Sequence, residues 1–422
     1  MTAPFPGRLG IQQRVLPRYR VAFFDALAAS CAGGLGLFAG LPRPEESIAV
    51  TDQLRTAHYA AAQNIHLLRG PFYLCYQRGL LRWLDGWQPD ALIVEANPRY
   101  LTTPAALRWA KRKNVPVIGW GLGAPPSGAP KFLRKWGEKQ RGAFLSRFDA
   151  LLTYSRRGAE EYAAIGFPAD KIFVAPNASA PRPTAPPPPR SPAPLPPLTI
   201  LFVGRLQARK RIDHLLRACA SLPDKIQPRL LIVGEGPEHA NLQTLAKEVY
   251  PRAEFTGAKF GEELAPYFSA ADLFVLPGTG GLAVQEAMSY GLPVIMGQGD
   301  GTNDDLVRPE NGWQIPPDDL AALRAALHNA LADVSRLRAM GAESYRIVAD
   351  EINLERMVGV FLEALDAVTG GVDHHERHKR EQEQITGQPL GDANIVGQLS
   401  GTLSPDVTIQ EYRKHLEEKY GG

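Results

Sequence analysis

The feature that most constrains the fold of this 422-residue chain is a proline-rich stretch near its middle. The sequence PRPTAPPPPRSPAPLPPL, residues 181–198, contains ten prolines. Because proline has no backbone N–H to donate to a helix or a sheet, this stretch predicts an extended, semi-rigid connector outside any packed domain. It divides the chain into two halves, each long enough for an ordinary domain.

Both halves show the same alternation of strands and helices. In the first half the apolar runs ALIVEA and VPVIGW flank a helical stretch, and ALLTYS precedes another helix. In the second half the strand-like runs are LTILFVGRL, PRLLIVGEG, AEFTGA, DLFVLPG and LPVIMG, with helical stretches after the first two. This order is typical of parallel βαβ units, and strands apolar along their whole length are covered by helices on both faces. We therefore expect an α/β fold with two Rossmann-like parallel-sheet domains facing each other across a cleft.

The expected boundaries follow the linker. The first domain is predicted to span residues 1–180 and the second residues 199–350, followed by a helix at 351–369 that returns to the first domain. Residues 370–422 have a different composition, with a charged start and a stretch rich in glycine, asparagine and serine. This composition predicts a partly disordered tail or a docking appendage.

Three histidines of the tail, His374, His375 and His378, have a spacing that fits a metal ion on one helical face. A solvated charged run is the simpler interpretation of the same residues.

Charge and cysteine content limit the possible environments. Residues 1–180 carry 23 Lys and Arg against 12 Asp and Glu, and the rest of the chain carries 24 against 32. A basic first half predicts an anionic partner, although uneven surface decoration explains the same asymmetry.

The three cysteines are far apart, which predicts a reducing, cytoplasmic compartment. The sequence does not open on a signal peptide, and the uncharged run 26–42 is shorter than the roughly 20 residues of a membrane span.

Candidate binding residues gather at the ends of the second-half strands, where open parallel sheets bind ligands. Gly204 leaves the backbone accessible, and Arg205 and Lys210 supply two positive charges beside a helix start, which predicts a diphosphate site. Two exposed surface charges are the alternative. The next two strand ends carry open turns whose glycines and lysine are Gly234, Gly236, Gly257 and Lys259.

A fourth strand end lies in FVLPGTGGLAVQEAMSYGLPVI, residues 274–295. A glycine-rich turn is followed by Glu286 near the start of a helix expected at residues 285–290. A carboxylate in this place either accepts hydrogen bonds from a ligand or complements the helix dipole.

These motifs together resemble the nucleotide-sugar glycosyltransferases of the GT-B fold, specifically glycosyltransferase family 4. The resemblance is closest over residues 199–320, in VGRL, IVGEGP, FTGAKFGEELAPYFSAADLFVLP and EAMSYGLPVI, and it extends more loosely over about residues 8–368. It implies a retaining transferase that moves a hexose-type sugar from a UDP- or GDP-sugar to a hydroxyl acceptor, without a cofactor or a metal ion. A lipid-linked saccharide, a polysaccharide or a glycolipid is the expected acceptor.

The same resemblance assigns roles to individual residues. It implies that Arg205 and Lys210 hold the donor diphosphate and that Glu286 binds the donor ribose hydroxyls, so these three are the catalytic candidates. The remaining donor-site candidates are Gly204, Gly234, Gly236, Gly257, Lys259, Gly278, Thr279, Gly280, Gly281 and Leu282.

The sequence departs from the family at two positions. Gly278 stands where the family has a second glutamate that contacts the donor sugar, and Leu122 stands where similar proteins often have a histidine. Either backbone donors of residues 279–282 hold the sugar, or transfer is impaired and the chain is a nucleotide-sugar binding protein. His58 and His66 are possible replacements, although each is more simply a packed or capped histidine on a helix.

The acceptor side is expected in the first-half loops QQRVLPRYR and EANPRY. Its candidates are Arg14, Arg18, Arg20, Glu95, Asn97 and Arg99. The stretch 130–148 carries six basic residues and one acid between apolar side chains, which suits a helix on the anionic inner face of a membrane. A helix packed on the sheet is the alternative.

Two further enzyme classes have less support. No strand is followed by Gly-x-Gly-x-x-Gly with an acid about 20 residues later, which argues against a dinucleotide enzyme. A GT-B epimerase would need acidic and histidine residues that the chain does not offer. No recognition motif points to nucleic acid.

Overall fold

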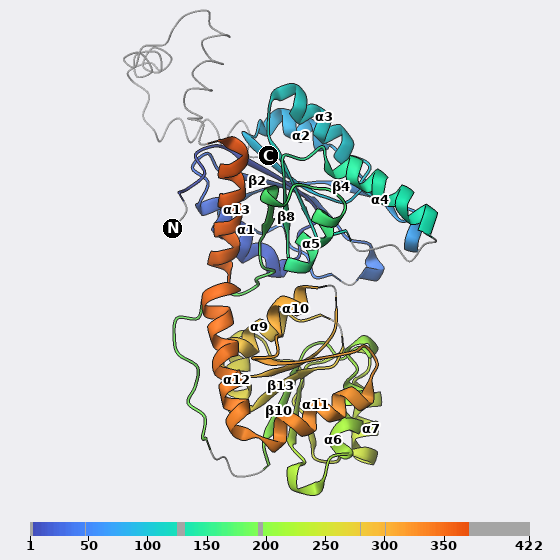
Figure 1. Cartoon of the computed structure of the whole chain (residues 1–422), viewed down its shortest axis with the longest axis vertical. Helices are drawn as coiled ribbons and strands as arrows, with labels where there is room; N and C mark the ends of the chain where they lie inside the picture. The colour runs from blue at the N-terminus through green and yellow to red at the C-terminus, as the bar shows by residue number, and fades with distance from the viewer. Residues whose placement is uncertain are drawn as a thin grey trace, which may run out of the picture. The chain divides into compact units, whose positions relative to one another are not determined.

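The computed structural model describes residues 3–370, except residues 47, 125–130, 193–196, 279 and 300. These described residues belong to one compact unit, Met1–Gly370, which contains two α/β domains built on parallel sheets (Figure 1). The predicted fold class is therefore confirmed. The tail, with His374, His375 and His378, lies outside the described residues.

The first domain has a seven-stranded parallel sheet in the order β3-β2-β1-β6-β7-β8-β9. Its strands are β1 (Leu9–Val15), β2 (Leu35–Gly40), β3 (His58–Ala61), β6 (Ala91–Glu95), β7 (Val117–Gly121), β8 (Ala150–Thr153) and β9 (Ile172–Val174). Its helices are α1 (Val21–Ala29), α2 (Leu80–Trp87), α3 (Thr103–Lys113), α4 (Lys131–Leu145) and α5 (Arg156–Ala164). The strand order changes direction between β1 and β6, which is the place where open sheets of this kind bind ligands.

The second domain has a six-stranded parallel sheet in the order β12-β11-β10-β13-β14-β15. Its strands are β10 (Thr199–Val203), β11 (Arg229–Val233), β12 (Ala253–Phe255), β13 (Leu273–Leu276), β14 (Val294–Gly297) and β15 (Gly312–Ile315). Its helices are α6 (Ile212–Ala220), α7 (His239–Val249), α8 (Ala265–Ala270), α9 (Leu282–Ser289), α10 (Thr302–Leu306), α11 (Leu320–Ala332) and α12 (Val334–Arg346). Here the order changes direction between β10 and β13.

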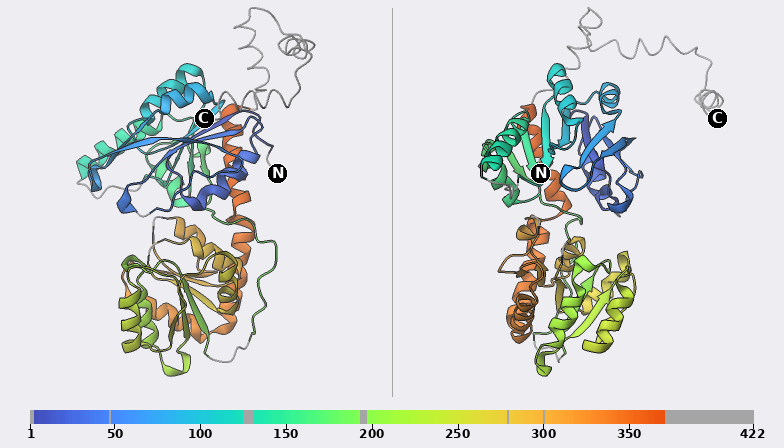
Figure 2. Two further views of the ribbon diagram at one scale, coloured as in Figure 1. Left: turned by 180° about the vertical axis from the view of Figure 1, so that it is seen from behind. Right: turned by 90° about the vertical axis from the view of Figure 1, so that its right-hand side faces the viewer.

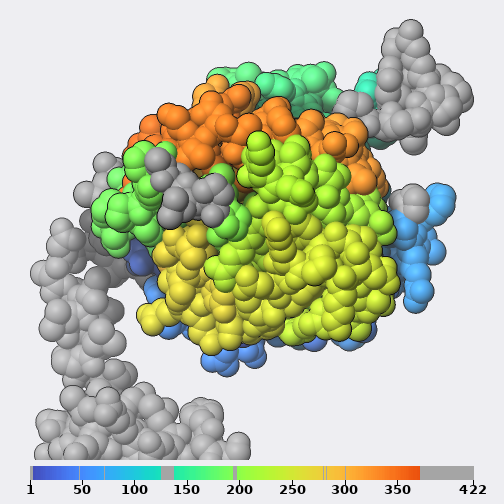
Figure 3. All heavy atoms as spheres, turned by 90° about the horizontal axis from the view of Figure 1, so that it is seen from below, coloured from blue at the N-terminus to red at the C-terminus, as the bar shows by residue number. Residues whose placement is uncertain are grey.

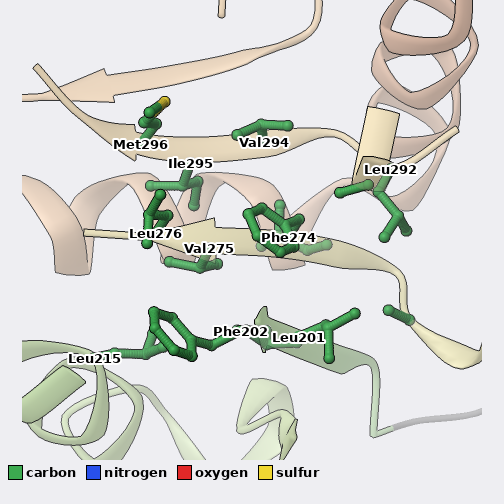
Figure 4. Close-up of a cluster of buried hydrophobic side chains, with 14 of the residues drawn as sticks. Leu201, Phe202, Leu215, Phe274, Val275, Leu276, Leu292, Val294, Ile295 and Met296 are labelled. Carbon is green, nitrogen blue, oxygen red and sulfur yellow. The ribbon is translucent and has the colours of Figure 1, made fainter. Parts of the chain in front are cut away.

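The apolar strands of the second domain form its core. Phe202, Phe274 and Ile295, from three neighbouring strands, have no exposed surface, and their side chains fill the space between sheet and helices (Figure 4). Side chains that alternate in direction along a strand are buried on both faces only if helices cover both faces. The uninterrupted apolar runs in the sequence are therefore strands that are buried on both faces, as predicted.

The C-terminal helix packs in the first domain. After α12, one turn of π-helix (Ile347–Glu351) leads into α13 (Leu354–Thr369). Phe361 of α13 contacts Phe23 and Trp120 of the first-domain core with ring centroids 4.9 Å apart in each case. The helix lies beside α1 (Figure 1), so a segment that follows the second domain in sequence completes the core of the first.

The linker runs along one side of the second domain (Figure 2) and is bound to it by several hydrogen bonds, three of which Arg190 donates. The guanidinium of Arg190 donates to the carbonyl oxygens of Ala271 (2.8 Å), Tyr290 (2.6 Å) and Phe268 (2.9 Å). Burial lowers the pKa of this guanidinium to about 10. The described linker residues 181–192 thus contain no helix or strand, and Arg190 is one of the residues that hold them on the domain surface.

Replacing Arg190 by Ala is expected to lower the free energy of unfolding by about 1–3 kcal/mol, because three carbonyl groups lose their donor. Urea unfolding followed by circular dichroism measures the change. Arg182→Ala is the matched control, since this linker arginine is exposed and should change stability by less than about 0.5 kcal/mol. Equal stability of the two variants would contradict the anchoring role of Arg190.

The structure corrects two local expectations. His58 lies on strand β3 and His66 on strand β4 (Gln63–Leu67), so neither is on a helix. β4 pairs with β5 (Leu74–Arg78) in an antiparallel hairpin that the sequence interpretation missed. Along both strands the side chains alternate between exposed and less exposed positions, which is the period of two that distinguishes a strand from a helix.

Candidate active site

Three turns at the ends of β10, β11 and β12 are joined by backbone hydrogen bonds. Gly204 N donates to Val233 O (3.0 Å), Leu206 N donates to Glu235 O (2.9 Å), and Gly234 N donates to Gly257 O (2.8 Å). The pairing of the strands therefore continues into the turns, and the turns lie side by side at one edge of the sheet.

Two of the glycines are required by this close packing. Gly234 has a φ of +145°, and a Cβ atom there would lie 1.9 Å from the carbonyl oxygen of Gly204. A Cβ atom at Gly236 would lie 2.2 Å from the carbonyl oxygen of Leu206. The glycines thus allow neighbouring turns to pack closely, and no side chain projects from the turns at these two positions.

Lys210 lies beneath the glycine-rich turn that follows β13. It is 9% exposed, and burial lowers its pKa to about 8. A Cβ atom at Gly280, where φ is +86°, would lie 2.9 Å from Nζ of Lys210. The turn therefore passes directly over the ammonium group.

Gly278 packs against the same segment. A Cβ atom at this position would lie 2.0 Å from the carbonyl oxygen of Arg209 and 2.6 Å from Cα of Lys210. A glutamate has no room here unless the backbone moves. The absence of the family's second acid is thus coupled to the close packing of this turn on the lysine segment.

A cavity of about 1050 Å³ opens beside these turns. Six of the predicted donor-site residues line it: Gly204, Arg205, Gly234, Gly236, Lys259 and Glu286. Gly257 is bonded to Gly234, one of the lining residues. Gly278, Gly280 and Gly281 belong to the adjoining turn after β13, and Lys210 lies beneath that turn. Thr279 and the side chain of Leu282 lie outside the described part of the structure.

Glu286, the predicted ribose-binding residue, lies in the wall of this cavity. Helix α9 begins at Leu282, three residues before its expected start, so Glu286 lies in the second turn and the dipole of the helix start does not explain it. Its carboxylate has no hydrogen bond or ion pair with any described residue, and burial raises its pKa. A half-buried carboxylate without a protein donor is well suited to accept hydrogen bonds from a bound ligand.

Several cavity residues were missed by the sequence interpretation. Gln285 of α9 accepts from the backbone N–H of Ser179 (2.8 Å) and donates to the carbonyl oxygen of Asn177 (2.5 Å). This holds the start of the linker against the cavity, where residues 179–184 form one wall. Phe260, which is 76% exposed, forms the rim beside Lys259.

The first-domain candidates divide into two groups. At the end of β1, the guanidinium of Arg14 donates to Glu46 (2.8 Å), and its backbone N–H donates to Glu95 (2.5 Å). Burial raises the pKa of Glu95 to about 7. These two residues meet where the strand order of the first sheet changes direction, which is the position expected of a ligand site.

The other first-domain candidates lie elsewhere. Arg20 is buried, donates to the side chain of Asn177 (2.5 Å) and lies over Trp120 and Tyr154, so it is a structural residue. Arg18 and Arg99 are exposed. The carboxamide of Asn97 accepts from the backbone N–H of Arg99 (3.1 Å).

For the stretch 130–148, which was interpreted as a membrane-binding helix, the packing of apolar side chains is described only at the C-terminal end. Phe144 and the buried residues Leu145 and Phe148 pack in a core cluster of the first domain, which agrees with the alternative of a packed helix. Side chains 131–136 lie outside the described set. Within the described ranges, no helix has the length and apolar character to cross a bilayer. Among the same residues, no three His, Cys or acidic side chains form a metal-binding group.

Comparison with known proteins gives matches for both halves. Residues 15–178 match the family model described as "Glycosyl transferase 4-like domain", and residues 197–333 match "Glycosyl transferases group 1". A GDP-mannose-dependent alpha-mannosyltransferase of Corynebacterium glutamicum is 37% identical over 153 residues, covering 36% of this chain and 35% of the relative. The putative colanic acid biosynthesis glycosyltransferase WcaL of Escherichia coli is 30% identical, covering 43% of this chain and 47% of the relative. This chain thus spans less than half the length of either relative.

Solved structures share the fold. The sucrose-phosphate synthase of Thermosynechococcus elongatus has a TM-score of 0.61 at 20% identity, covering 86% of this chain and 100% of that protein. HepE of Anabaena in complex with UDP has a TM-score of 0.59 at 13% identity, covering 85% of this chain and 99% of that protein. With the two family models spanning most of both domains, the chain belongs to the GT-B glycosyltransferases of family 4 type.

Proposed function

We propose that this protein transfers a hexose-type sugar from a nucleoside-diphosphate sugar to a hydroxyl acceptor. The observation that carries the proposal is the Glu286 carboxylate, which faces a large cavity and has no partner among the described residues. The exposed Arg205 in the same wall and the buried Lys210 beneath the adjoining turn supply positive charge for a diphosphate.

The proposed reaction is a metal-independent substitution with retention at the sugar. The bond between the anomeric carbon and the diphosphate oxygen breaks, and a bond to the acceptor oxygen forms on the same face. The departing diphosphate takes the proton of the acceptor hydroxyl. Arg205, Lys210 and the backbone N–H groups of the glycine turns stabilise the developing negative charge, so the protein acts through position and electrostatics.

We propose that the donor is a UDP- or GDP-sugar. A GDP-mannose-dependent relative and a structural neighbour solved with UDP support these two nucleotides. Phe260 and Lys259 at the cavity rim offer an aromatic face and a charge to the base. On the first domain, Arg14 and Glu95 are the residues that we assign to the acceptor.

A donor-turnover assay tests the proposal. The full chain is incubated with UDP- and GDP-sugars, released nucleoside diphosphate is quantified, and proton NMR identifies the anomer that forms first. We expect release from one nucleotide family with the anomeric configuration retained. The opposite anomer would overturn the retaining mechanism. Nucleotide binding without release, even with saccharide and glycolipid acceptors, would favour a nucleotide-sugar binding protein.

The pKa of Lys210 gives a pH-dependent prediction. The ammonium is charged below about pH 8 and neutral above it, so nucleotide-sugar affinity should fall as pH rises, by about tenfold between pH 7 and pH 9. Titration calorimetry at the two pH values measures the change. Lys210→Arg keeps its charge throughout this range and should remove most of the dependence. An equal slope in this variant would assign the titration to another group.

A further inference from the structure

In the hairpin of β4 and β5, the amides of Asn64 and Gln77 face the protein, whereas several large apolar side chains face solvent. On the inner side, Gln77 is buried and donates to the carbonyl oxygen of Gln13 (3.0 Å) and to Oδ1 of Asn64 (2.8 Å). Asn64 in turn donates to the carbonyl oxygens of Arg14 (2.7 Å) and Leu41 (2.8 Å). Because the buried Gln77 and the half-buried Asn64 lose these partners if the strands slip by one residue, this network fixes which face points outward.

The outward face is apolar. Ile65 is paired with Tyr76 across the hairpin, and Leu67 follows on the same face of β4. These three side chains are between 38% and 42% exposed. At the tip, Leu68 is 64% exposed and Phe72 is 75% exposed. In the space-filling view, a light-blue segment, the colour of residues close to 70, stands out at the right-hand edge (Figure 3).

The concentration of apolar side chains at this hairpin is unusual for a surface. Most of the exposed large hydrophobic residues of the described chain lie in the first domain, and five are in this one hairpin. Leu68 also has a φ of +57°, a conformation that disfavours a leucine. A contiguous exposed apolar patch of this kind is typical of an interaction surface.

Within the hairpin and the first residues after it, the charges are of one sign. Residues 63–82 contain three arginines, Arg69, Arg78 and Arg82, and no acidic residue. All three are exposed, and none forms an ion pair with another described residue. A second copy of the chain docked on the same face would bring these like charges together, which disfavours a symmetric dimer.

We propose that the outward face of this hairpin, formed by Ile65, Leu67, Leu68, Phe72 and Tyr76, docks on an anionic lipid bilayer. Leucine and aromatic side chains enter the interface between headgroups and acyl chains, and the surrounding arginines contact the acidic headgroups. The proposal does not depend on glycosyl transfer, because the patch lies outside the cavity that contains Glu286.

Vesicle sedimentation with the full chain tests the proposal. We expect binding to vesicles of phosphatidylcholine with phosphatidylglycerol, and much weaker binding to phosphatidylcholine alone. Phe72→Ser should reduce the partition coefficient about tenfold, because one buried aromatic side chain is lost. Arg69→Gln should reduce it roughly fivefold at low salt.

The chain offers matched controls for both variants. Phe260→Ser removes an aromatic side chain of almost the same exposure from the second domain, and Arg217→Gln removes an exposed arginine from α6. Both should bind vesicles like the wild type. Equal losses in the hairpin variants and their controls would overturn the proposal, as would wild-type binding that does not depend on the anionic lipid.

A labelled cysteine at the tip gives an independent test. The three native cysteines are buried, so an environment-sensitive dye should react preferentially at Leu68→Cys. Anionic vesicles should shift the emission of this dye to the blue, and a dye at Gln243→Cys on α7 should not respond. A blue shift that instead depends on protein concentration without lipid would identify a second copy as the partner and contradict the membrane assignment.

Discussion

Replacing Lys210 by Met should lower kcat/KM for the nucleotide sugar by about 10²- to 10³-fold, the loss typical of one electrostatic stabiliser of a developing anion. The ammonium lies under Gly280 in a buried place, where the charge is screened little by water. Steady-state release of nucleoside diphosphate measures the effect. Lys247→Met, which removes an exposed lysine of α7, is the matched control and should keep full activity.

Stability separates a role in the reaction from a role in folding. Methionine keeps the length of the side chain, so Lys210→Met should still unfold in one cooperative urea transition close to that of the wild type. A loss of activity together with a large loss of stability would show that the lysine acts by holding the glycine turn. Full activity of a stable variant would remove Lys210 from the site.

Replacing Glu286 by Ala should weaken donor binding by about 10- to 100-fold, because a carboxylate that accepts hydroxyl hydrogen bonds contributes about 1.5–3 kcal/mol. Titration calorimetry with a UDP- or GDP-sugar measures the change. Glu262→Ala is the control, since this acid is exposed outside the cavity wall.

A ligand without ribose hydroxyls identifies what Glu286 recognises. The wild type should bind the 2′,3′-dideoxy form of the nucleotide much more weakly than the ribose form, and Glu286→Ala should bind both forms equally. If the variant keeps the preference for ribose, another group reads the hydroxyls and the assigned role of Glu286 is wrong.

The sheets were predictable because their strands are buried on both faces. Runs such as LFVL and VIMG are apolar without interruption, which indicates a parallel sheet before any contact is known. The hairpin of β4 and β5 was missed for the opposite reason. Its large apolar residues are exposed and one of its two buried residues, Gln77, is an amide, so the pattern does not identify the side that faces the core.

The candidate site was predictable where a strand end and a glycine turn coincide in sequence. Gly204, Gly234 and Glu286 were found in this way. The linker wall was not, since Gln285 and Ser179 are 106 residues apart and nothing local connects them. The sequence also does not explain why position 278 is a glycine, because the backbone that excludes a side chain there belongs to Arg209 and Lys210.

Titration calorimetry of UDP and GDP against the full chain tests the central claim most directly. The claim is that the cavity beside the glycine turns is a nucleotide-sugar donor site. We predict one-site binding of one of these nucleotides to the wild type, with weaker binding to both Lys210→Met and Glu286→Ala. Absence of binding for both nucleotides, or equal affinity in the wild type and the two variants, would contradict the claim.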